Sequence, residues 1–188
     1  LLKQTVKVDN TKADDVSAWT EESEGIYKAS YTAHLIGDKL TAQLTMPGWQ
    51  TKHSDAFSIA GDKDTAKIAA MQITANNAVA RRDHNTVAVT VRDVHQNLLQ
   101  GQNVTFTVVN GAAVFADPNG GIVTTDKDGI ASVNLASDQA VNSLIKAEIN
   151  GSSQSVEVSF ITGDISQLTS TIKTDDVSYT AGGKIKVS

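Results

Sequence analysis

Apolar and polar residues alternate with a period of two along this sequence, and this alternation restricts the fold more than any other feature. Val87, Val89 and Val91 are separated by Ala88 and Thr90. Successive side chains of a β-strand point to opposite faces of a sheet, so such a segment buries one face and exposes the other. The pattern recurs at Val104, Phe106 and Val108, at Val133 and Leu135, at Ile145, Ala147 and Ile149, and at Val156, Val158 and Phe160. Because no segment keeps a helical 3.6-residue period beyond a turn or two, the sequence predicts an all-β protein.

Turn signals containing glycine separate the alternating segments. Asn110-Gly111, Asp128-Gly129 and Asn150-Gly151 each pair glycine with a residue that tolerates the positive φ of a hairpin turn. Gln100-Gly101 and the run from Asp117 to Gly121 are further signals of the same kind. Short strands at this spacing are typical of a β-sandwich.

An internal repeat sets the size of the folding unit. The segment IAGD at Ile59–Asp62 matches ITGD at Ile161–Asp164, so the displacement from position 59 to position 161 is 102 residues. A repeat of about 100 residues has the size of an immunoglobulin-like sandwich. The sequence predicts tandem immunoglobulin-like β-sandwiches in an elongated array. Residues 1–63 are predicted to form the back part of one domain, 64–162 a complete domain, and 163–188 the opening strands of a following one.

The predicted junctions between these domains are short. Gly61-Asp62 and Gly163-Asp164 are not embedded in a Ser/Gly-rich spacer, so consecutive domains are expected to touch and to flex little. Incomplete domains at both ends would leave strand edges unpaired. We therefore expect the sequence to be a section of a longer array.

Charge and composition exclude several classes of function. The net charge is −5 and Arg81-Arg82 is the only basic doublet, so no nucleic-acid partner is expected. The sequence has no cysteine, which excludes a disulfide framework, a thiolate zinc site and a cysteine nucleophile. No segment approaches the roughly 18 apolar residues of a membrane helix. We therefore expect no direct membrane contact by this chain.

The predicted middle domain carries a dense set of family-specific motifs. They are VAVTVRDVHQNLLQGQNVTFTVVNGAAVF at 87–115, TTDKDGIASVNLAS at 124–137 and IKAEINGSSQSVEVSFI at 145–161. These segments resemble the bacterial immunoglobulin-like domains (group 1, Big-1) of the invasin and intimin family of Gram-negative adhesins. The sequence departs from the family pattern at 95–97, where His-Gln-Asn stands and glycine is commoner, which puts the geometry of that turn in doubt. Trp19 and GIYKASYTA at 25–33 resemble variant domains of the same family.

This resemblance implies a role in attachment. It implies an outer-membrane barrel anchor upstream and a passenger displayed on the bacterial surface. The implied partners are a host cell-surface or extracellular-matrix protein and the neighbouring immunoglobulin-like domains of the same chain. Two alternatives stay open: a purely structural spacer of a surface rod, and an accessory module of a secreted carbohydrate-active enzyme.

No motif for catalysis or cofactor binding occurs, so we expect neither an enzyme nor a cofactor. The sequence lacks a G-x-S-x-G elbow, a phosphate-binding glycine loop and an HExxH pair. None of its histidines has a second histidine three or four residues away, and spacing therefore predicts no metal site. The histidines are His34, His53, His84 and His95.

Aspartate clusters raise the separate question of a cation. Asp126–Gly129 resembles the start of a calcium loop but lacks its remainder, and a β-turn explains the same residues. Asp14-Asp15, Asp62 with Asp64, and Asp175-Asp176 fall near predicted domain edges, where an interdomain cation is an alternative. Solvated turns are the favoured interpretation.

Tryptophan 49 is the one candidate receptor contact. Pro47 and Gly48 interrupt the strand alternation beside Trp49, and tryptophan is enriched in interface hot spots. Packing of Trp49 on its own or a neighbouring domain is the alternative. The other aromatic residues expected on inward faces are Trp19, Tyr27, Tyr31, Phe57, Phe106 and Phe160.

Overall fold

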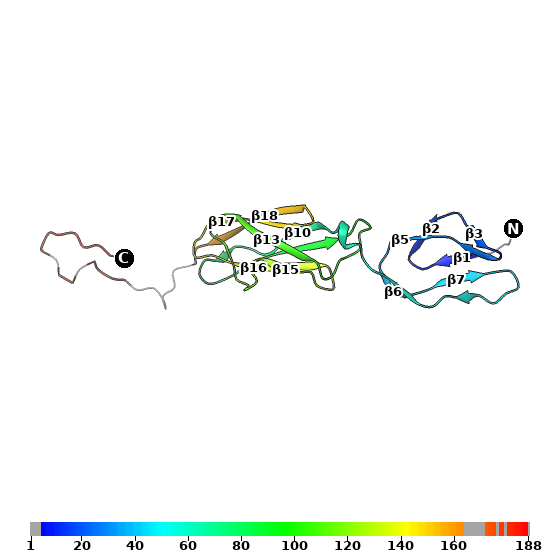
Figure 1. The fold of residues 1–188 in the computed structure, drawn as a ribbon. Helices are drawn as coiled ribbons and strands as arrows, with labels where there is room; N and C mark the ends of the chain where they lie inside the picture. The colour runs from blue at the N-terminus through cyan, green and yellow to red at the C-terminus, as the bar shows by residue number, and fades with distance from the viewer. Residues whose placement is uncertain (1–4, 164–171, 176, 179, 188) are drawn as a thin grey trace.

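The computed structural model describes residues 5–163, 172–175, 177–178, 180–187. Nine strands between Lys67 and Ile161 form two sheets that pack face to face, and we call this part the middle sandwich (Figure 1). The four-stranded sheet has the order β10 (Lys67–Ala75), β12 (Asn85–Arg92), β16 (Ile130–Ala136) and β14 (Val114–Phe115). The five-stranded sheet has the order β11 (Ala78–Val79), β18 (Ser152–Ile161), β17 (Asn142–Ile149), β13 (Asn103–Asn110) and β15 (Ile122–Thr124).

Neighbouring strands of the middle sandwich are antiparallel, with one exception. The short strand β11 pairs with β18 in parallel, with Ala78 opposite Phe160. The chain therefore enters on the first sheet through β10 and crosses to the second sheet at β11. Two sheets of this size and connectivity form an immunoglobulin-like β-sandwich, so the predicted fold class is confirmed.

The core of the sandwich consists of the residues that alternate in the sequence. Val87, Val89 and Val91 of β12 are buried, and they face Val158 and Phe160 of the opposite sheet within one core cluster. Val108 and Val156 are partly buried and pack against that cluster. The predicted inward faces are thus confirmed throughout the sandwich.

Buried polar side chains connect the strands where regular pairing stops. Asn85 is fully buried. It accepts from the Ala78 backbone N–H (3.0 Å) and donates to the Ser159 carbonyl (2.8 Å). Because buried amides are costly unless paired, this side chain fixes β11 and β18 against β12.

Residues 5–63, called here the N-terminal unit, are also built from strands. A three-stranded sheet has the order β1 (Thr5–Val8), β7 (Ala42–Thr45) and β8 (Lys52–His53). Two-stranded ribbons pair β2 (Thr11–Val16) with β5 (Tyr31–Ala33), β3 (Thr20–Ser23) with β4 (Ile26–Lys28), and β6 (Gly37–Leu40) with β9 (Phe57–Ile59). A single turn of 3₁₀-helix, η1 (Lys63–Thr65), leads into β10.

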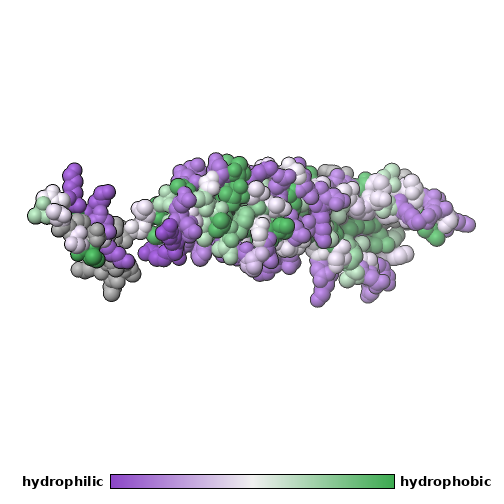
Figure 2. Space-filling view, turned by 60° about the vertical axis from the view of Figure 1, so that its left-hand side comes forward, coloured by the Kyte–Doolittle hydropathy of each residue, from purple (hydrophilic) through white to green (hydrophobic). Residues whose placement is uncertain are grey.

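The N-terminal unit has no buried residue among its described positions. Trp19 and Tyr27 were predicted to point inward, but they are 44% and 50% exposed, so this prediction is wrong. The reason is that β3 and β4 pair only with each other in the described chain. Tyr31 and Phe57 are half-buried. Hydrophobic surface consequently appears in separate patches among hydrophilic residues (Figure 2).

Across the described residues, no helix has the length and apolar content needed to cross a membrane.

Candidate functional site

The contact between the N-terminal unit and the middle sandwich is a polar site built from side chains of both regions. It starts at the connection from β9 to β10. A Cβ added to Gly61 would lie 2.3 Å from Leu99 Cδ2, so a side chain at this position would force Leu99 of the sandwich to shift. Asp62 then caps η1 by accepting from the Asp64 backbone N–H (3.2 Å).

Asp93, directly after β12, accepts four hydrogen bonds at this contact. Its Oδ1 accepts from the backbone N–H groups of His95 and Asn97 (2.9 Å each). Its Oδ2 accepts from Asn97 Nδ2 (2.9 Å) and from the Asp62 N–H (3.2 Å). Burial raises the pKa of Asp93, but the hydrogen bonds from Asn97, Asp62 and His95 outweigh burial and hold the pKa below its ordinary value.

Asn97 extends the network from the sandwich into the N-terminal unit. Its Nδ2 donates to the His34 carbonyl (2.9 Å), and its Oδ1 accepts from the Ile36 N–H (3.2 Å). The amide thus pairs with the 34–36 segment much as a neighbouring strand would. These bonds attach the N-terminal unit to the turn at 93–97.

This turn is the one that departs from the family pattern. Gln96 has φ +71°, a left-handed conformation that glycine adopts at little cost. The turn therefore keeps the geometry that glycine would favour while carrying His95 and Asn97 on either side. Both of these side chains contact the N-terminal unit, His95 at His34 and Asn97 at His34 and Ile36.

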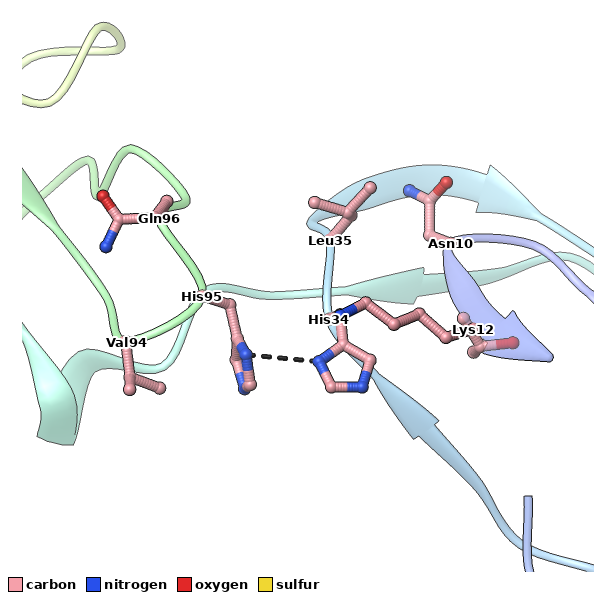
Figure 3. A pocket seen from close by; sticks show the side chains of 8 residues that line it. Asn10, Lys12, His34, Leu35, Val94, His95 and Gln96 are labelled. Atoms are coloured by element: carbon pink, nitrogen blue, oxygen red, sulfur yellow. Dashed lines mark hydrogen bonds between the residues drawn. The ribbon is translucent and has the colours of Figure 1, made fainter. Parts of the chain in front are cut away.

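Two of the histidines meet in this contact. His34 lies between β5 and β6, and His95 lies in the turn after β12, 61 residues away in sequence. Their Nδ1 atoms are 3.2 Å apart, and the rings are perpendicular with centroids 4.7 Å apart (Figure 3). On its other side, His34 Nε2 pairs with the Asp15 carboxylate. The rings border a cleft lined by Asn10, Thr11, Lys12, His34, Leu35, Val94, His95 and Gln96.

The aspartate clusters of the sequence serve mainly as turns. Asp126 Oδ1 accepts from the backbone N–H groups of Asp128 and Ile130 (2.9 Å each), as in the predicted β-turn. Asp175 Oδ1 accepts from the Lys186 N–H (3.4 Å), and Asp176 lies outside the described residues. No group of three or more His, Cys, Asp or Glu side chains suited to a metal occurs in the part of the chain that the structure describes.

Trp49 lies far from the domain contact. It occupies the loop between β7 and β8, at the end of the N-terminal unit that points away from the sandwich (Figure 1). Its backbone N–H donates to the Met46 carbonyl (3.0 Å), and Gly48 has φ +80°. The residue is 62% exposed. The turn therefore presents the indole to solvent.

Comparison with known proteins gives a consistent result. The family model for the bacterial Ig-like domain (group 1) matches residues 68–161. The inverse autotransporter adhesin YeeJ of Escherichia coli K12 is 35% identical over 168 residues, which cover 88% of this chain and 7% of YeeJ. The chain thus spans a small fraction of that relative.

Two solved structures share the fold. The Escherichia coli adhesin FdeC aligns with a TM-score of 0.58 at 17% identity, over 98% of this chain and 59% of that one. Yersinia pseudotuberculosis InvD aligns with a TM-score of 0.51 at 16% identity, over 95% and 53%. From the matched motifs, the sandwich and these similarities together, the chain belongs to the bacterial Ig-like domain (group 1) family.

Proposed function

We propose that this chain is a passenger segment of an outer-membrane-anchored bacterial adhesin of the invasin and intimin type, and that it mediates or supports attachment to host cells or matrix. The observation that carries this proposal is the 35% identity to the adhesin YeeJ across 88% of the chain. We place the segment on the bacterial cell surface.

The domain division of this passenger follows the sequence repeat. Residues 1–63 are the back part of one immunoglobulin-like domain, 64–162 a complete domain and 163–188 the opening strands of the next. The sandwich strands from Lys67 to Ile161 and the junction at Gly61 support the first two of these units. Within the third, positions 164–171, 176, 179 and 188 lie outside the described residues. The neighbouring domains of the same chain are thus its first partners.

In this proposal the segment binds a partner and extends the passenger away from the membrane, rather than catalysing a reaction. The turn at 93–97 holds the N-terminal unit through two hydrogen bonds of Asn97, which donates to the His34 carbonyl and accepts from the Ile36 N–H. A junction of this kind limits bending between consecutive domains, which keeps a distal surface away from the membrane. Besides the neighbouring domains of the same chain, the proposed partner is a host cell-surface or extracellular-matrix protein.

Trp49 is the proposed contact residue for that partner. It is exposed at the far end of the N-terminal unit, where burying an indole would remove a large apolar area from water and retain an N–H donor. Trp49→Ala in the intact passenger should abolish most adhesion to epithelial cells. It should change the unfolding free energy by less than about 1 kcal/mol, as at other exposed sites.

Trp19→Ala is the matched control, because Trp19 is also an exposed tryptophan of the N-terminal unit. It should leave adhesion unchanged. Equal adhesion of the parent, Trp49→Ala and Trp19→Ala would show that Trp49 is not part of the receptor contact. If deletion of residues 1–163 also leaves the remaining passenger's affinity unchanged while shortening its reach, the segment is a spacer rather than a binding surface.

A further inference from the structure

We propose that His34 and His95 form a binding site for a transition-metal dication such as Zn²⁺, and that the bound metal ties the N-terminal unit to the middle sandwich. The site is distinct from the proposed receptor contact at Trp49. It rests on the placement of two imidazoles that come from different parts of the chain and meet in one exposed cleft (Figure 3).

The separation of the ring nitrogens carries the proposal. The Nδ1 atoms of His34 and His95 are 3.2 Å apart. Two imidazole nitrogens bound to one tetrahedral zinc at the usual bond length lie roughly 3.3 Å from each other. The two donor atoms are therefore already at the spacing that a shared metal requires.

Asp15 supplies the second element of such a site. A carboxylate only accepts hydrogen bonds, so its contact with His34 Nε2 places the proton on that nitrogen. In neutral His34, the lone pair is then on Nδ1, which faces His95. A carboxylate that orients a histidine through its other ring nitrogen is the usual outer-shell arrangement of metal-binding histidines.

The backbone of His95 is held by Asp93. Its N–H donates to Asp93 Oδ1 (2.9 Å). Without metal, His95 Nδ1–H donates to His34 Nδ1. Metal binding requires this proton to move to His95 Nε2, which changes the tautomer without releasing a proton. His95 is exposed, so solvent can assist that transfer.

The surroundings of the pair allow a small ion to enter. Asn10 and Gln96 line the same cleft and contribute amide groups, while Leu35 and Val94 form its apolar parts. Lys12 also lines the cleft, and its charge opposes a dication while that of Asp15 favours it. Two histidines fill two positions of a tetrahedral metal, so water from the cleft is expected to complete the coordination.

Isothermal titration of ZnCl₂ into the metal-free 188-residue chain tests the proposal. We expect one Zn²⁺ per chain and a monomer by sedimentation. His34→Gln and His95→Gln should each weaken binding at least about tenfold, and Asp15→Asn about tenfold, the lower range for outer-shell partners of metal ligands. His53→Gln and His84→Gln are the matched controls and should bind as the parent does.

Thermal unfolding provides a second readout. Zn²⁺ should raise the melting temperature of the parent and of both controls but not that of the His34 and His95 variants, since a ligand stabilises only the state it binds. Circular dichroism in EDTA checks that the variants fold. The proposal is overturned by absence of Zn²⁺ binding, by binding that survives either substitution, or by half an equivalent of Zn²⁺ with dimer formation.

Discussion

The middle sandwich and the N-terminal unit are made of similar strands but are stabilised differently. In the sandwich, the alternating valines of β12 and the Phe160 side chain of β18 meet in a continuous core. In the described part of the N-terminal unit no residue reaches the buried state, although Val6, Val8 and Leu44 alternate with polar residues in the same way. Alternation thus specifies strands, whereas a core also requires a second sheet to cover the apolar face.

The difference changes how each region keeps its position. The sandwich is held by apolar burial that involves strands from both sheets. The N-terminal unit is attached to it through directed hydrogen bonds, two between Asn97 and the 34–36 segment and one from the Asp62 N–H to Asp93. The hydrophobic effect is non-directional, whereas each hydrogen bond depends on the distance and angle between its donor and acceptor.

The largest effect is expected for a core truncation. Leu135 is fully buried in β16, so Leu135→Ala should cost about 2 to 5 kcal/mol of unfolding free energy, through lost transfer energy and a cavity. Leu44→Ala in the half-buried β7 should cost less than about 1 kcal/mol. Denaturant unfolding followed by circular dichroism measures both. Similar losses at the two sites would show that the N-terminal unit has a core of its own.

A backbone substitution should give the next largest effect. Gly129 has φ +69°, and an added Cβ would lie 2.9 Å from the Val91 carbonyl oxygen. Gly129→Val should therefore destabilise the sandwich by about 3 kcal/mol, the upper range for a strained conformation. Gly25 also has a positive φ, but open space surrounds its Cβ position. Gly25→Val should leave the melting of the sandwich unchanged, and an equal drop for both variants would refute the proposed clash.

Acid should weaken the end of the sandwich that faces the N-terminal unit. The folded-state pKa of Asp93 is lowered, so its contribution is present above the unfolded value of about 3.9 and is lost as pH falls through the folded value. Asp93→Asn should cost about 1.5 kcal/mol at pH 7, the scale of a hydrogen bond to a charged group.

The pH series supplies the control for Asp93. Stability measured from pH 7 down to pH 3 should fall less steeply at the acid end for Asp93→Asn than for the parent. Parallel curves would mean that the Asp93 carboxylate contributes nothing that depends on its charge.

The sequence predicted the sandwich but only part of the junction between it and the N-terminal unit. The valine alternation and the turn at Gly129 follow from strand and turn geometry, which act over a few residues. Trp19 and Tyr27 were misplaced because their exposure depends on the absence of a covering layer over β3 and β4 in the described chain. A local pattern carries no information about which sheet faces it.

The histidine pair shows the same limit. His34 and His95 are 61 residues apart, and no short-range spacing links them. One signal was present in the sequence: 95–97 is where the chain departs from the glycine that its family favours. Two of those three positions, His95 and Asn97, make the contacts with the N-terminal unit.

The most direct test is the distance between the two regions in solution. The sequence has no cysteine, so Lys52→Cys in β8 and Thr107→Cys in β13 can be spin-labelled without competing sites. Pulsed electron paramagnetic resonance should give one narrow distance distribution, and Asn97→Ala should broaden it by removing the bonds to His34 and Ile36. A distribution that is already broad in the parent, and that Asn97→Ala leaves unchanged, would contradict a stiff junction between the N-terminal unit and the sandwich.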